Sequence, residues 1–159
     1  MTEMVEPFGF VLAVLMLLGT PGPTNTLLAA SGAVVWMGRS LRLIAAEVGG
    51  YLLAISLLIS VVGPVVADHA WFGTALRLAA GAWLAYCALR LWREAASGFT
   101  LTETRISMGR MFLTTTLNPK ALIFAFVIFP PGTLPQMLPW LGVFAVCAVA
   151  VAGSAVGVV

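Results

Sequence analysis

The residues best suited to chemistry in this chain lie in two proline-containing segments, Thr20-Pro21-Gly22-Pro23-Thr24-Asn25 and Leu117-Asn118-Pro119-Lys120. Both segments interrupt long apolar stretches. A proline removes one backbone donor and frees the carbonyl one turn earlier, so neither segment fits a continuous helix. Each segment also contains an asparagine, and the second contains the only lysine of the chain. Freed backbone groups, amides and an ammonium in apolar surroundings indicate a binding site for a small polar molecule.

The second segment predicts a helix that begins inside an apolar stretch. Asn118 is a favoured N-cap residue, and Pro119 suits the first helical position, where its missing N–H is not needed. The free N–H groups of the first turn and the Lys120 ammonium would then attract a carboxylate. The alternative is a kinked helix whose lysine extends to the membrane interface.

The first segment predicts a site of the opposite polarity. Pro23 disfavours the helical conformation for Gly22, so the helix must break there. The carbonyls freed before the break could accept hydrogen bonds from an ammonium group. The side chains that could add to them are Thr20, Thr24 and Asn25. The alternative is a proline kink that only shapes the helix.

A single carboxylate, Glu47, lies near the start of the second apolar stretch. An ionisable residue at membrane depth is a functional candidate, either as a proton carrier for ion coupling or as the partner of a cation. The alternative is an interfacial glutamate that pairs with Arg42 or Arg39.

Composition places the chain among integral membrane proteins. Hydrophobic residues make up 61% of it and charged residues 9%, whereas soluble domains carry about 25% charged residues. Uncharged runs extend over Pro7–Gly38, Val48–Ala67 and Ala121–Val159, and about 20 apolar residues suffice to cross a bilayer as a helix. The net charge of +2 is too small to suggest a nucleic-acid partner.

No signature of an enzyme is present. The sequence contains no metalloprotease, serine-hydrolase or phosphate-binding loop motif. Its single histidine, His69, excludes mechanisms that need two, and neither Cys87 nor Cys147 has the spacing of a metal ligand. We therefore expect no catalytic residue, no metal and no cofactor.

We predict an all-α, polytopic membrane helix bundle in which residues 1–159 form one domain. The five predicted spans are Phe8–Ser31, Leu43–Val66, Gly73–Trp92, Met111–Phe129 and Trp140–Val159. The proline-rich link 130–139 is expected to be non-helical. Six of the seven arginines lie on one side of these spans and only Arg77 lies near the other. The positive-inside rule then predicts an external N-terminus and a cytoplasmic C-terminus in the inner (plasma) membrane.

The two breaks suggest an internal repeat. One break lies in the first of the three spans of segment 8–92. The other break lies in the first of the two spans of segment 111–159. Because a unit of three spans is odd, its repeat must be inverted in the membrane, and paired interrupted helices in inverted halves mark transporter sites. The second repeat lacks its third helix, so we expect either a truncated chain or completion by a second subunit, as in a homo-oligomer.

On these motifs the chain resembles the LysE/RhtB family of amino-acid exporters. The segment Thr20–Leu28 is similar to the signature at the end of that family's first helix. Gly38-Arg39 and Gly49-Gly50 fall where the family has a glycine-spaced second helix. Leu117–Ala121 is similar to the Asn-Pro-Lys motif that opens its second half. The resemblance covers about residues 8–129.

The resemblance implies six helices in two inverted repeats and export driven by an ion gradient. The residues it assigns to the substrate site are Pro21, Gly22, Pro23, Asn25, Asn118, Pro119 and Lys120. We therefore expect a secondary exporter of amino acids or related small zwitterions. The alternative is a membrane scaffold or partner subunit that transports nothing, in which the prolines only shape the bundle.

The predicted topology can be tested by cysteine labelling. In a background without Cys87 and Cys147, an impermeant maleimide added from outside should label Asp68→Cys and should not label Arg105→Cys until the membrane is permeabilised. Labelling of Arg105→Cys in intact cells would reverse the predicted orientation.

Overall fold

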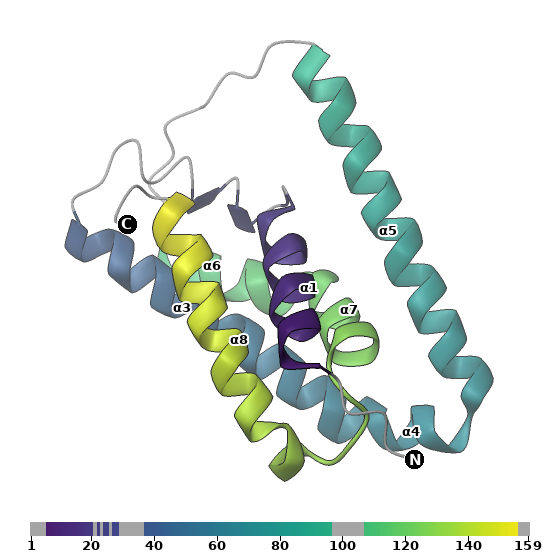
Figure 1. The fold of residues 1–159 in the computed structure, drawn as a ribbon. Coiled ribbons are helices and arrows are strands. Elements are labelled where there is room, and N and C mark those ends of the chain that lie inside the picture. Colours follow the sequence, from purple (N-terminus) through teal and green to yellow (C-terminus); the bar gives the residue numbers. More distant parts are fainter. Residues whose placement is uncertain are drawn as a thin grey trace.

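The computed structural model describes residues 6–20, 22, 24–25, 27–28, 37–96 and 107–155, and these residues are helical apart from short breaks (Figure 1). The elements are α1 (Pro7–Gly19), α3 (Met37–Leu57), η1 (Leu58–Val62), α4 (Gly63–Asp68), α5 (Ala70–Ala96), α6 (Met108–Thr116), α7 (Lys120–Ile123), η2 (Phe124–Ile128) and α8 (Leu134–Ala155). The segments η1 and η2 are single turns of π-helix. The all-α fold class is therefore confirmed for the described residues.

Two helical stretches in this part of the chain are long and apolar enough to cross a bilayer. They are Ser40–Asp68, which joins α3, η1 and α4, and Leu134–Ala155, which is α8. Met108–Thr116 and Lys120–Ile128 form a third candidate if they are counted as one span bent by 48°. These helices are compatible with a membrane protein, while the five-span arrangement and its orientation stay predictions.

Both predicted breaks occur where the prolines indicated. α1 ends at Gly19, with Thr20 as its C-cap, and α6 is separated from α7 by the turn at Leu117–Pro119. Pro21 and Pro23 themselves lie outside the described residues. The predicted third span, Gly73–Trp92, lies entirely within the 27-residue α5.

The predicted end of the proline-rich link was wrong. α8 begins at Leu134 and continues through Pro139, whereas we expected a helix only from Trp140. The reason is a capping interaction: the Thr133 N–H donates to Gln136 Oε1 at 3.0 Å, which is one half of a capping box. Pro135 lies in the first turn, where a missing N–H costs little.

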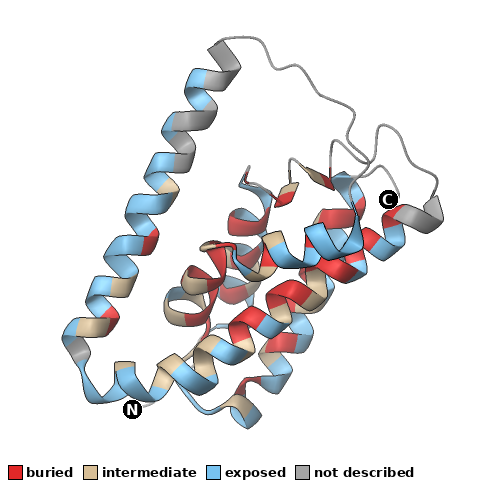
Figure 2. Cartoon of the chain, turned by 180° about the vertical axis from the view of Figure 1, so that it is seen from behind, coloured by how far each residue is buried: buried red, intermediate tan, exposed pale blue. Residues whose placement is uncertain are grey.

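The core lies where α1, α3, α7, η2 and α8 meet, and buried residues gather there (Figure 2). Edge-to-face aromatic contacts join Tyr51, Phe124 and Phe144, with ring centroids 4.8–5.8 Å apart. α3 packs most extensively on α6. Gly50 permits this approach, because a Cβ there would lie 2.9 Å from the Phe112 carbonyl oxygen.

α5 leaves the bundle along most of its length (Figure 1). It contacts α4, α7 and η2, and its far end diverges from the other helices. Large side chains such as Trp71, Trp83 and Trp92 are exposed on it. An exposed aromatic and aliphatic surface of this kind is compatible with a lipid environment.

Candidate functional site

The two helix breaks meet inside the bundle, although they lie far apart in sequence. Lys120 begins α7 and is only 3% exposed. Its Nζ donates a hydrogen bond to the Thr20 carbonyl, 100 residues earlier in the chain. Because α1 ends at Gly19, this carbonyl lies beyond the regular helical hydrogen bonds and needs another donor. The lysine ammonium therefore completes the end of the first helix.

Gly22 packs directly on the lysine side chain. A Cβ built on Gly22 would lie 3.2 Å from Lys120 Cε and 3.3 Å from Lys120 Nζ. Few real Cβ contacts are that close, so a larger residue at position 22 would press on the ammonium-bearing end of the lysine. Because Gly22 has no side chain, it leaves room for Lys120.

Asn118 joins the same two breaks to a third helix. Its Nδ2 donates to Thr24 Oγ1 at 2.7 Å and to the Tyr51 hydroxyl at 3.2 Å. Its Oδ1 accepts from the Lys120 backbone N–H at 3.0 Å. All four residues are buried, so both polar atoms of the amide are used in the interior. We predicted Asn118 as the N-cap residue and Pro119 as the first helical residue, and this was wrong by one position: α7 begins at Lys120 and its N-cap residue is Pro119. Asn118 still accepts the N–H of the first helical residue, Lys120.

Asn25 caps the first helix from the other side. Its Nδ2 donates to the Leu18 carbonyl at 2.6 Å and to the Thr20 carbonyl at 3.2 Å. The Thr20 hydroxyl donates to the Met16 carbonyl at 2.9 Å. We expected the carbonyls near 17–19, just before the break, to receive an ammonium from a ligand. The ammonium found on the Thr20 carbonyl is that of Lys120.

Glu47 lies on α3, one turn before Tyr51, and is 4% exposed. Its Oε2 has no hydrogen-bond partner among the described residues, and its carboxylate is close enough to Lys120 to interact with it electrostatically. Arg42 is exposed, and no salt bridge joins it to Glu47 in the described part of the chain. The side chain of Arg39 is not among those described. The burial of Glu47 argues against an interfacial glutamate paired with Arg42.

We call Thr20, Thr24, Glu47, Tyr51, Asn118 and Lys120 the Lys120 cluster. All of its members except Thr20, which is exposed, are buried. The cluster thus combines a cation, a carboxylate, an amide and hydroxyls. Tyr51 was not expected there. A tyrosine one turn after a buried glutamate is the signal that could have indicated it, because a buried phenol hydroxyl needs a hydrogen-bond partner.

Comparison with models of known protein families, with curated proteins and with solved structures gives no significant match to this chain. The resemblance to the LysE/RhtB family therefore stays a prediction that rests on the motifs.

The bond between Asn118 and Tyr51 can be measured in a double-mutant cycle. We expect Asn118→Leu to lower the free energy of unfolding by about 1–3 kcal/mol, because buried hydroxyls lose their donor. Combined with Tyr51→Phe, it should show a coupling energy of about 0.5–1.5 kcal/mol. Unfolding in mixed micelles measures both values. Ser154→Ala is the control, since the Ser154 hydroxyl bonds only the Val151 carbonyl of its own helix. Its effect on the free energy of unfolding should be additive with that of Asn118→Leu.

Proposed function

We propose that this chain is a secondary transporter of the LysE/RhtB type, which exports amino acids or related small zwitterions across the cytoplasmic membrane. The observation that supports this most is the convergence of two broken helices on the buried Lys120 cluster. Non-helical backbone at membrane depth is tolerated where protein encloses it or where it lines a polar cavity. Paired breaks in corresponding segments are the best pointer to the substrate site of a transporter.

The charges of the cluster match those of a zwitterion. Lys120 carries one positive charge and Glu47 can carry one negative charge, and both are buried. A substrate carboxylate on Lys120 and a substrate ammonium near Glu47 and the Thr20 carbonyl would replace the internal contacts with equivalent ones. We therefore regard the arrangement described here as a closed state, in which the lysine occupies the ammonium site itself.

Export would require this contact to open. The bend of 48° between α6 and α7 and the end of α1 at Gly19 supply hinges next to the cluster. In our proposal, substrate separates the two breaks on one side of the membrane, and the Lys120–Thr20 contact re-forms after release. The five spans, the inverted repeat and the external N-terminus belong to this proposal.

A second candidate is a membrane scaffold that transports nothing. The observation in its favour is that Lys120 and Asn118 already have partners within the chain. If these contacts are purely structural, their loss should reduce stability and affect all solutes equally.

Comparison of an amino acid with its amide separates the two candidates. We expect Lys120→Met to weaken export of the amino acid sharply and that of the uncharged amide far less. Removal of one partner from a buried charge contact typically costs 2–5 kcal/mol, roughly 30-fold or more in affinity. The measurement is export of both solutes from cells with matched amounts of folded protein.

Two further variants sharpen this experiment. Lys120→Arg should restore export only partly, because a planar guanidinium replaces a compact ammonium. Arg110→Gln changes an exposed charge outside the cluster and should leave both solutes unaffected. Absence of export by the wild type would support the scaffold. An equal loss of amino-acid and amide export in Lys120→Met would show that Lys120 has only a structural role.

Glu47 is the candidate for ion coupling. If its carboxylate carries a proton during each cycle, Glu47→Gln should abolish the dependence of export on the pH gradient while the protein still reaches the membrane. Lys120 and Tyr51, which are also titratable, lie near Glu47. The internal pH is therefore held constant while the pH gradient is varied. Unchanged pH dependence in Glu47→Gln would show that the proton travels elsewhere.

A further inference from the structure

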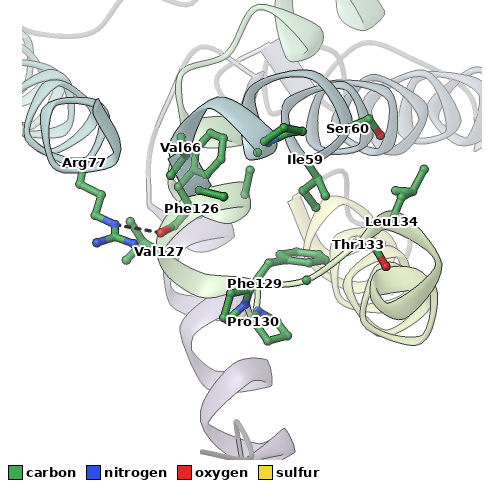
Figure 3. Close-up of a pocket in the computed structure, with 16 residues that line it drawn as sticks. Ile59, Ser60, Val66, Arg77, Phe126, Val127, Phe129, Pro130, Thr133 and Leu134 are labelled. Carbon is green, nitrogen blue, oxygen red and sulfur yellow. Dashed lines mark hydrogen bonds between the residues drawn. The ribbon is translucent and has the colours of Figure 1, made fainter. Parts of the chain in front are cut away.

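A cavity that is partly open to the surface lies apart from the Lys120 cluster. This cavity, of about 690 Å³, is bounded by η1 and α4, by the start of α5, by η2 and by the chain from Phe129 to Leu134 (Figure 3). Small-molecule sites in proteins typically measure about 300–1,000 Å³. No member of the Lys120 cluster lines the cavity, so a ligand here would be distinct from the transported solute.

Arg77 is the one ionisable side chain among the described residues that line this cavity. Its Nε donates to the Phe126 carbonyl at 3.1 Å, which fixes the guanidinium beside the π-helical turn η2 (Figure 3). The structure records no other hydrogen bond or ion pair of Arg77 within the described part of the chain. A guanidinium has five N–H donors, so its terminal nitrogens can still bind an anion.

The remaining walls are mainly apolar. Aromatic and aliphatic side chains dominate them, and the two hydroxyl groups come from Ser60 and Thr133. The apolar lining residues are Ile59, Val66, Phe126, Val127, Phe129 and Leu134. A ligand that fits must therefore combine one negative group with a hydrocarbon part.

We propose that this cavity binds an anionic amphiphile, with its carboxylate or phosphate head on Arg77 and its hydrocarbon chain against the apolar walls. Arginine matches planar carboxylate and phosphate groups through two parallel hydrogen bonds. Burial of the hydrocarbon chain of the ligand against these walls adds affinity with each CH₂ group. A free fatty acid and one chain of an anionic phospholipid share this chemistry. The proposal is independent of the transported substrate.

Native mass spectrometry of the full chain, released from neutral detergent, tests the proposal. We expect oleate to bind the wild type and to lose about 10-fold or more in affinity in Arg77→Gln, because the variant lacks the charged hydrogen bonds of the guanidinium. Oleyl alcohol, with the same chain and no charge, should bind weakly and equally to both proteins. Arg110→Gln is the matched control and should bind oleate like the wild type.

A second variant blocks the space and leaves the arginine in place. Ser60 is exposed and lines the cavity, so Ser60→Trp should fill it without disturbing the core and should abolish oleate binding. Phosphatidylglycerol competing better than phosphatidylcholine would identify a phospholipid as the source. Equal oleate affinity in wild type and Arg77→Gln, or equally effective competition by inorganic phosphate alone, would overturn the proposal.

Discussion

The Lys120 ammonium donates to the Thr20 carbonyl across two interrupted helices, and the interior of the bundle is arranged around that hydrogen bond. The first helix ends at Gly19, so the Leu18 and Thr20 carbonyls accept from side chains instead of from helical N–H groups. An unpaired buried carbonyl is costly where water is scarce. A side chain with a full positive charge satisfies this carbonyl from the other half of the chain. The two breaks therefore stabilise each other.

Asn118 links the two helix breaks to α3. Through Thr24 and Tyr51 its amide connects the first break to α3, and through the Lys120 backbone it fixes the start of α7. The network satisfies Asn118 fully but leaves one oxygen of Glu47 without a partner among the described residues. Polar networks at low dielectric are rigid when complete, and the Glu47 carboxylate is the incomplete member of this one.

The breaks after Gly19 and around Leu117–Pro119 could be predicted from the sequence, because proline acts through local geometry. The start of α7 was predicted one residue too early, since Pro119 is its N-cap residue. Sequence reasoning could not assign the partners. The ammonium expected on the carbonyls of the first break turned out to be Lys120 of the second break, and a contact over 100 residues has no local signature. Tyr51 was missed although its place one turn after Glu47 was visible, because its partner Asn118 lies 67 residues away in the sequence. The helix through Pro139 was misjudged because the Thr133–Gln136 capping pair outweighed the prolines that surround it.

The position of the single lysine has a consequence for chemical labelling. Reagents that acylate amines react with neutral, accessible amino groups, and Lys120 is the only side chain in the protein that offers one. At 3% exposure it is shielded in the arrangement described here. Acylation of this amine therefore requires an arrangement in which Lys120 is more exposed than in the one described here. The chain carries its own reporter of that exposure, with no other lysine to add background.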